Sequence, residues 1–250
     1  MISAAIVALN EAEKLESCLN SIKDFADEIV VVDLGSKDET EKVCEKYGAK
    51  IYHHRLVPYV EKVRDFSISK TSNEWVLVLD PDEQITDNLK NELKSVFESN
   101  EYSAVNIPRK NIFFGGWIAH TNWWPDKHVR FFKKGIVSWS EIHVYPTVEG
   151  KILELPAKEE LAIIHHGYNS ISEFIDRQNR YARVEGDQLY GKGVRFSWTK
   201  FIWWPMRVFL TRFIKHQGYL DGMYGFVLVY LMMIYKITVL VKLWEKDNVR

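Results

Sequence analysis

Glu74-Trp75-Val76-Leu77-Val78-Leu79-Asp80-Pro81-Asp82-Glu83 joins an apolar run to a cluster of carboxylates. The apolar run predicts a buried strand, and the carboxylates follow at its C-terminal tip, where an open α/β sheet binds its ligand. Mg²⁺ is usually held by one or two carboxylates together with substrate phosphates, so the tip predicts a metal and diphosphate site on Asp80 and Asp82. The alternative is a solvated acidic turn that caps a helix starting near Thr86.

A strand, a polar tip and a helix occur in this order three times before that segment. Apolar or β-branched runs predict strands over residues 2–9, 28–33 and 50–53, each followed by residues at helical spacing. This alternation predicts an α/β fold with a parallel sheet and right-handed crossovers. The strand tips then share one edge, which brings together Asn10, Glu11, Asp33 and Asp80. There Asp33 would accept a hydrogen bond from a base N–H and Glu11 would bind a ribose hydroxyl. For a lone Asp, a helix cap is the alternative.

Composition and motifs exclude several classes of protein. The 250 residues include 33 Lys plus Arg and 34 Asp plus Glu, so no basic field favours nucleic-acid binding. Neither Gly-x-Gly-x-x-Gly after the first strand nor Gly-x-x-x-x-Gly-Lys occurs, which argues against dinucleotide and Walker-type sites. Cys18 and Cys44 fall on expected helices without a secretory signal, so we expect a reduced, cytosolic compartment.

Three segments resemble family 2 glycosyltransferases with the GT-A fold in their order and spacing. They are Ala-Leu-Asn-Glu at 8–11, Glu-Ile-Val-Val-Val-Asp-Leu-Gly-Ser-Lys-Asp-Glu-Thr at 28–40 and Trp-Val-Leu-Val-Leu-Asp-Pro-Asp-Glu at 75–83. In that family the first Asp-rich turn binds the nucleobase and ribose, and the Asp-x-Asp motif binds the metal and diphosphate of a UDP-sugar or similar donor. The resemblance implies Mg²⁺ or Mn²⁺ as cofactor and assigns these roles to Asn10, Glu11, Asp33, Asp80 and Asp82.

Two basic positions extend the donor site. Arg64 and Asp65 are similar to a family position where a basic and a polar residue approach the nucleotide. Arg180 lies in a Gln-x-Arg-Tyr pattern that resembles the segment closing the family's diphosphate site. Exposed charges on helices are the alternative for all three residues.

The composition changes after Phe113. Segments 110–117 and 122–132 interleave aromatics, glycines and charges without helical period, which fits a carbohydrate site including Trp117 and Trp124, because aromatic faces stack on sugar rings. Trp-Trp-Pro-Asp at 123–126 and Arg-Phe-Phe at 130–132 resemble the acceptor half of the lipopolysaccharide-core glucosyltransferase branch. Core packing is the alternative for the phenylalanines.

An inverting transfer needs a carboxylate base across the sugar from the metal. Asp126 and Glu141 are both candidates, because the related branch carries a His-Glu pair where this chain has His143-Val144. His143 would orient a phosphate or an acceptor hydroxyl. We do not expect a metal site at His165-His166, because adjacent strand residues point to opposite faces and only one of them can serve one site.

The C-terminal third is expected to be helical and to attach to a membrane. Segment 196–213 interleaves bulky apolar residues with Lys and Arg, which indicates an interfacial helix. Segment 226–243 is long enough to cross a bilayer, but a central Lys236 costs roughly 2.5–3.5 kcal/mol on insertion. We expect peripheral or monotopic attachment, with a soluble oligomer interface as the alternative. Gly-Tyr-Leu-Asp-Gly-Met-Tyr-Gly at 218–225 matches a signature of the same lipopolysaccharide branch.

Together these features predict a GT-A fold with a mostly parallel nucleotide-binding sheet flanked by helices and a helical, membrane-associating C-terminal extension. The expected division is a nucleotide-sugar half at 1–110, an acceptor half of the same domain at 111–168 and a helical region at 169–250. The expected activity is metal-dependent, inverting transfer of a sugar to a lipid-linked or lipopolysaccharide-type acceptor at the cytoplasmic face of the inner membrane. UDP-glucose is the expected donor. A nucleotidyltransferase and a non-catalytic nucleotide-binding membrane scaffold are the alternatives.

Overall fold

The computed structural model describes residues 1–57, 59–139 and 146–248. The chain forms two compact units. The sheet unit comprises residues 1–110 and 126–165, and the helical unit comprises residues 111–125 and 166–250. The division into donor half, acceptor half and extension concerns binding roles and stays a prediction.

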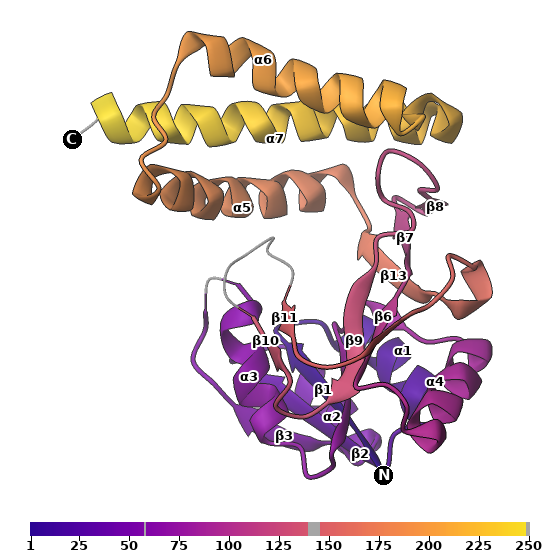
Figure 1. Ribbon diagram of the computed structural model, residues 1–250. Coiled ribbons are helices and arrows are strands. Elements are labelled where there is room, and N and C mark those ends of the chain that lie inside the picture. Colours follow the sequence, from indigo (N-terminus) through magenta and orange to yellow (C-terminus); the bar gives the residue numbers. More distant parts are fainter. Residues whose placement is uncertain (58, 140–145, 249–250) are drawn as a thin grey trace. The chain divides into compact units, whose positions relative to one another are not determined.

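A seven-stranded sheet forms the centre of the sheet unit, in the order β12-β6-β9-β4-β1-β2-β3 (Figure 1). β9 is antiparallel to both of its neighbours, and the other adjacent pairs are parallel. The sheet is therefore mostly parallel, as expected, with one antiparallel strand inserted between β6 and β4. Its strands are β1 (Ile2–Ala8), β2 (Glu28–Asp33), β3 (Lys50–His53), β4 (Trp75–Leu79), β6 (Ala104–Ile107), β9 (His128–Lys133) and β12 (Ile152–Glu154).

Helices cover both faces of this sheet because its central strands are apolar on both sides. Every residue of β1 is buried. Ile2, Ala4, Ile6 and Ala8 share a core cluster with apolar residues of α1, α2 and α4, whereas Val7 packs with residues of α3 on the other face. These helices are α1 (Ala12–Ile22), α2 (Thr40–Lys46), α3 (Glu61–Ser69) and α4 (Asp87–Ser99).

The strand order reverses direction between β1 and β4. From β1 the chain adds β2 and β3 on one side, and it then returns to place β4 on the other side. Open α/β sheets bind ligands at the carboxyl ends of the strands at such a switch point. The carboxylates that follow β4 lie at that place. A short strand after them, β5 (Glu83–Gln84), pairs with the first residues of β13 (Ile163–Tyr168). β10 (Val137–Ser138) and β11 (Thr147–Val148) form a separate hairpin, and a 3₁₀ turn covers Glu159–Leu161.

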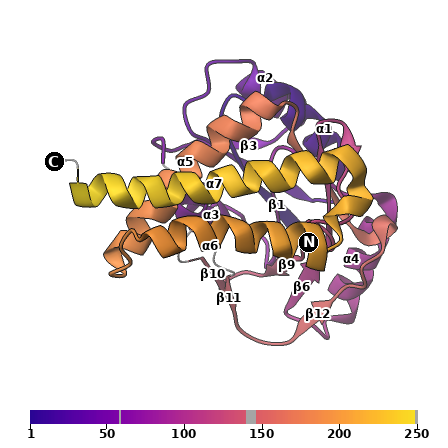
Figure 2. The same ribbon diagram turned by 90° about the horizontal axis from the view of Figure 1, so that it is seen from above.

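The helical unit is built around three helices. α7 (Gly222–Asn248) runs beside both α5 (Ile171–Gly191) and α6 (Trp198–Phe209) (Figures 1 and 2). Ser170 and Ser197 cap the first turns of α5 and α6 through their side chains. A π-helical turn (Leu210–Lys215) and a 3₁₀ turn (Gly218–Asp221) connect α6 to α7, and the end of β7 (Arg109–Phe113) pairs with β8 (Gly116–Trp117).

The helical expectation for the C-terminal third is confirmed, and the segment from Gly218 to Asn248 is long and apolar enough to cross a membrane by length and composition. Only a third of its most apolar window is buried. Inward-facing residues of α7, including Leu228 and Leu231, pack with Phe113, Tyr168 and Phe174. Other apolar side chains of α7, including Met223, Phe226 and Ile234, are exposed.

Candidate functional site

A tight turn holds the acidic residues that follow β4. The backbone N–H of Asp80 donates to Glu83 Oε2 at 2.9 Å, and the N–H of Glu83 donates back to the Asp80 carbonyl at 2.9 Å. Glu83 is fully buried and Asp82 is 6% exposed. The next helix has its own cap, because Thr86 Oγ1 accepts from the N–H of Leu89. The alternative of an acidic turn that caps α4 is therefore wrong.

Three arginines surround these carboxylates. Arg64 Nη2 donates to Asp80 Oδ1 at 2.9 Å, and Arg130 Nη2 donates to Asp80 Oδ2 at 2.6 Å. The same Arg130 nitrogen lies 2.7 Å from Glu83 Oε1, which Arg109 Nη1 approaches at 3.2 Å. Buried carboxylates persist in the ionised form when opposite charges and hydrogen bonds compensate for lost solvation. The guanidiniums provide that compensation.

The ionisation states follow from these pairs. Burial acts to raise the pKa of Asp80, but Arg130 and Arg64 outweigh it and hold the pKa far below the ordinary value. Burial acts to lower the pKa of Arg109, but Asp126 and Glu83 raise it above the ordinary value. At neutral pH Asp80 and Arg109 are therefore both charged.

Asp126, one of the two candidates for the base, lies next to this cluster. Arg109 binds its Oδ2 through Nε at 3.0 Å and Nη2 at 2.7 Å. His128 Nε2 lies 3.1 Å from its Oδ1. Burial and then Arg109 lower the pKa of His128, so this imidazole is neutral at pH 7. Asp126 thus lies between a guanidinium and a neutral imidazole.

His165 lies on the other side of the acidic turn. Its Nε2 is 3.6 Å from Asp82 Oδ2, and both side chains are buried. β13 pairs antiparallel with β5, with His165 opposite Glu83, and this register places the imidazole beside the turn. A carboxylate and an imidazole at this separation form a donor set for a divalent cation. Only His165 of the two adjacent histidines is placed beside Asp82, in agreement with the alternation along the strand.

The tips of β1 and β2 form the second part of the edge. Asn10 Oδ1 accepts from the N–H of Lys37 at 2.7 Å, and the N–H of Asn10 donates to Ser36 Oγ at 2.8 Å. Asp33 is buried and accepts from the N–H groups of Gly35 and Ser36. The N–H of Glu11 lies 3.3 Å from the Thr40 hydroxyl, which brings it to the same tip. The sheet therefore brings together the polar tips that the sequence assigned to the nucleoside.

One further group of potential ligands lies at this tip. Ligand atoms of Asp33, Glu41 and His53 lie within 4.8 Å of one another, and Glu41 and His53 are exposed. Such exposed acidic groups are common without an ion. The pair of Asp82 and His165 differs from this group in being buried and in lying at the turn that follows Asp80.

The remaining candidate residues have different surroundings. Arg64 is buried, so the alternative of an exposed charge pair is wrong for it, whereas Asp65 is exposed. In the helical unit, Arg180 is exposed on α5. Trp117 and Trp124 are half-buried and in contact, with ring centroids 5.7 Å apart and planes at 88°. Glu141 and His143 lie outside the described residues.

Sequence reasoning missed the contributions of Arg109, Arg130, Glu83 and His165. Arg130 is flanked by the buried Phe131 and Phe132 on β9, and an arginine inside an apolar strand requires a buried acid as partner. That signal identifies a buried ion pair. It does not identify the partner, because β4 and β9 pair across a long sequence separation.

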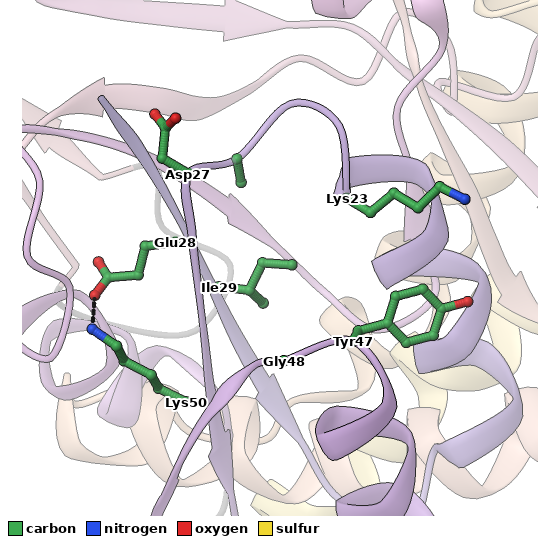
Figure 3. A pocket seen from close by; sticks show the side chains of 8 residues that line it. Lys23, Asp27, Glu28, Ile29, Tyr47, Gly48 and Lys50 are labelled. Atoms are coloured by element: carbon green, nitrogen blue, oxygen red, sulfur yellow. Dashed lines mark hydrogen bonds and ion pairs between the residues drawn. The ribbon is translucent and has the colours of Figure 1, made fainter.

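A hollow also lies at the opposite edge of the sheet, at the amino ends of β2 and β3 (Figure 3). Glu28 and Lys50 line it and form an ion pair of 2.6 Å. Both charges are therefore compensated by each other. The hollow is remote from the strand tips and carries none of the candidate residues.

Comparison with known proteins agrees with this geometry. The family model described as glycosyl transferase family 2 matches residues 3–152. An uncharacterized glycosyltransferase of Rickettsia conorii is 29% identical over 244 residues, covering 90% of this chain and 83% of that protein. The lipopolysaccharide core biosynthesis glycosyltransferase LpsC of Rhizobium meliloti is 23% identical over 258 residues, covering 100% of this chain and 94% of that protein. Glucosyl-3-phosphoglycerate synthase from Mycobacterium tuberculosis, solved with Mn²⁺ and UDP, aligns with a TM-score of 0.37 and 26% identity over 46% of this chain and 44% of that one.

Proposed function

Because the chain belongs to glycosyl transferase family 2 and is a glycosyltransferase with the GT-A fold, we propose that it catalyses metal-dependent, inverting transfer of glucose from UDP-glucose to a lipid-linked or lipopolysaccharide-type acceptor. One observation carries the proposal. Asp82 and His165 form a buried donor pair at the carboxyl end of β4, beside the charged cluster of Asp80. Family membership favours glycosyl transfer over nucleotidyl transfer.

Asp82 and His165 are the proposed ligands of the divalent cation. Asp80 is the weaker ligand, because both of its carboxylate oxygens already accept from arginines. Mg²⁺ and Mn²⁺ suit carboxylate oxygens, and the imidazole favours Mn²⁺ over Mg²⁺. When bound, the ion would neutralise the charge that develops on the departing diphosphate. Arg64 and Arg130 hold the Asp80 carboxylate in place, where it would assist at the ribose or the metal.

The proposed nucleoside site is the pair of tips at β1 and β2. Asp33 accepts two backbone N–H bonds, which hold its carboxylate rigid at the tip. A carboxylate offers about four acceptor positions, so capacity remains for the N–H of a nucleobase. Asn10 and Glu11 would flank the ribose. Asp65 and Arg180 stay predictions for this site.

Asp126 is the proposed base. In the reaction the acceptor hydroxyl attacks the sugar C1, the bond from C1 to the diphosphate oxygen breaks, and the hydroxyl proton passes to the base. Arg109 keeps Asp126 ionised and fixes its orientation through two hydrogen bonds. Neutral His128 contacts the other carboxylate oxygen. Glu141 remains the alternative base, and His143 an acceptor residue, by sequence alone.

The acceptor is proposed to be a glycan at a membrane surface. Twenty large hydrophobic side chains are exposed among the described residues, and fifteen of them lie between Trp198 and Trp244. The segment from 195 to 217 has five Lys or Arg residues and neither Asp nor Glu. This combination of aromatic, apolar and basic residues suits the headgroup region of an anionic bilayer. The free cysteines, Cys18 and Cys44, fit the reducing cytoplasmic side.

The polar residues of α7 favour attachment over a span. Lys236 Nζ donates to Glu185 on α5 at 2.6 Å, and the hydroxyl of Tyr235 bonds to the same carboxylate. α5 has seven charged residues in 21 and cannot enter hydrocarbon. A spanning α7 would lose this partner and leave an uncompensated ammonium. We therefore propose that α6 and α7 lie in the headgroup region of the bilayer and that α5 packs against α7 on the side away from the lipid.

Two assays test the function: metal-dependent hydrolysis of UDP-glucose, and transfer of glucose from UDP-glucose to acceptors in membrane extracts. Asp82→Asn keeps the shape of the side chain but removes its charge, and it should abolish both activities. Asp87→Asn is the matched control, since Asp87 is 90% exposed and forms a surface ion pair with Lys90 on α4. Wild-type activity of Asp82→Asn in the presence of Mn²⁺ would contradict the proposal.

A further inference from the structure

The Gly218–Gly225 segment, whose sequence pattern resembles that of the lipopolysaccharide branch, also has a structural role. It contacts residues 114–124, the aromatic loop, which lies in the same helical unit. We propose that Asp221 is a positioning residue: it holds the aromatic loop in one conformation and orients His120 toward the acceptor. The link to the acceptor rests on the proposed function, whereas the positioning of the loop does not.

Asp221 is bound to the loop by three hydrogen bonds. Its Oδ2 accepts from the N–H of His120 at 2.9 Å, and its Oδ1 accepts from the N–H of Ala119 at 3.2 Å. Oδ1 also lies 2.8 Å from Nδ1 of His120. The Asp221 side chain is 4% exposed, so it is desolvated and its compensation comes from this loop. Hydrogen bonds to a buried carboxylate are among the strong ones.

A second set of contacts ties the next residues to the turn before α7. Arg212 Nη1 donates to the carbonyl of Thr121 at 2.7 Å, and its guanidinium lies 5.2 Å from the ring centroid of Trp123. The N–H of Thr121 donates to the carbonyl of His216 at 3.1 Å. Thr121 and Asn122 have φ of 56° and 63°. A β-branched residue adopts such a φ only when surrounding contacts impose it.

The glycines of the segment allow this close approach. A Cβ at Gly218 would lie 2.5 Å from Cγ2 of Thr121, and a Cβ at Gly225 would lie 1.9 Å from the carbonyl oxygen of Gly218. Real Cβ atoms essentially never come under 3.0 Å. The spacing Gly-x-x-Asp-Gly-x-x-Gly thus has a physical reason. Gly225 packs against the backbone of Gly218, Gly218 packs against Thr121 of the aromatic loop, and Asp221 accepts hydrogen bonds from N–H groups of that loop.

The functional consequence concerns Trp117, Trp124 and His120. The two tryptophans already stand edge to face, which suits a platform for a sugar ring with little ordering cost on binding. A carboxylate only accepts hydrogen bonds, so Nδ1 of His120 donates to Asp221 and Nε2 remains for another partner. The imidazole is a third exposed and can form a hydrogen bond with an acceptor hydroxyl.

Hydrogen exchange measured by mass spectrometry tests the positioning role. In Asp221→Asn only one oxygen can accept and an NH₂ faces the N–H of His120, so protection of the amides in 114–124 should fall about tenfold or more. Helices α5 to α7 should keep their protection. His120→Ala should show part of the loss, and His120→Asn should restore it because an amide NH₂ can replace the Nδ1–H donor. Asp247→Asn is the control, since this carboxylate near the C-terminal end of α7 forms a surface pair with Arg195.

Thermal stabilisation by UDP with Mn²⁺ separates this inference from the proposed function. Asp221→Asn should keep the wild-type stabilisation, because the donor site lies in the sheet unit. Unchanged protection in 114–124, or an equal loss across α5 to α7, would overturn the positioning role; Gly218→Ala gives an independent second variant with the same expected local loss. If UDP fails to stabilise the wild-type protein, the proposed function fails while the exchange result still decides the role of Asp221.

Discussion

Charge reversal at Arg207 and Lys215 should release the protein from anionic vesicles. Both side chains are exposed in a segment without acidic residues. Each basic residue near an anionic surface contributes about 1 kcal/mol. Two reversals change the charge by about four units, so the double variant Arg207→Glu, Lys215→Glu should bind about 1,000-fold more weakly, at about 1.4 kcal/mol per tenfold. This loss should shrink in high salt because surface charges are screened.

A matched apolar variant separates charge from burial. Ile202 and Met223 are 68% and 73% exposed. Full burial of such a side chain contributes about 1.5–3 kcal/mol, so Ile202→Ser with Met223→Ser should lose about 2–4 kcal/mol of binding after scaling by exposure. High salt should not rescue this variant. Ile175→Ser is the control, since Ile175 is 48% exposed on α5, away from the proposed surface.

The assay is sedimentation with vesicles of phosphatidylcholine, with and without phosphatidylglycerol. The wild-type protein should bind the anionic vesicles, and the charge variant should resemble the wild type on the neutral ones. The reasoning is refuted if the wild type stays in the supernatant, or if the variants keep wild-type binding. Conversion of a dimer to a monomer by the apolar variant, with no effect on vesicle binding, would instead assign the surface to a second copy of the chain.

Two other predictions concern buried charges of the sheet unit. Glu83→Gln should reduce the free energy of unfolding by about 3–5 kcal/mol in urea titrations, because it removes one of the two acidic partners of Arg109 and of the buried Arg130; a loss below about 1 kcal/mol would contradict the buried ion-pair network. Burial acts to raise the pKa of Glu28, but Lys50 and neighbouring hydroxyl and amide donors lower it from 4.5 to about 2. Glu28 therefore contributes about 2–3 kcal/mol to the free energy of unfolding above pH 4.5, and this contribution is lost as the pH falls toward 2. In Glu28→Gln the free energy of unfolding should accordingly fall less steeply over this pH range. Glu16→Gln, at an exposed pair, should leave this pH dependence unchanged.

Local sequence pattern predicted much of the sheet unit. Runs of apolar residues predict buried strands. When these strands are parallel, the polar residues that follow them, such as Asn10, Asp33 and Asp80, lie at one edge of the sheet. This reasoning placed Asn10, Asp33 and the acidic turn at one edge of the sheet. The GT-A fold was expected from the resemblance of three segments to family 2 glycosyltransferases, and the family match confirms it.

Long-range pairing set the limits of prediction. The insertion of β9 between β6 and β4 brings Arg130 to Asp80 over a separation of 50 residues, and no local pattern encodes that contact. His165 is beside Asp82 because of the register of β13 with β5. Alternation along the strand showed that only one of the two adjacent histidines can serve a site, but not which neighbour it would meet. Asp221 likewise contacts a loop about 100 residues earlier in the chain, a contact that no local sequence pattern encodes.

Calorimetric titration of UDP in the presence and absence of Mn²⁺ tests the donor site most directly. The wild-type protein should bind UDP far more tightly with Mn²⁺, and Asp82→Asn should lose this difference while Asp87→Asn keeps it. Neither substitution removes a residue of the cluster formed by Asp80, Glu83 and the arginines. An unchanged unfolding midpoint in each variant would therefore exclude a fold defect as the cause of lost binding. UDP binding that is independent of Mn²⁺, or a wild-type response in Asp82→Asn, would contradict a metal-dependent glycosyltransferase built on Asp82 and His165.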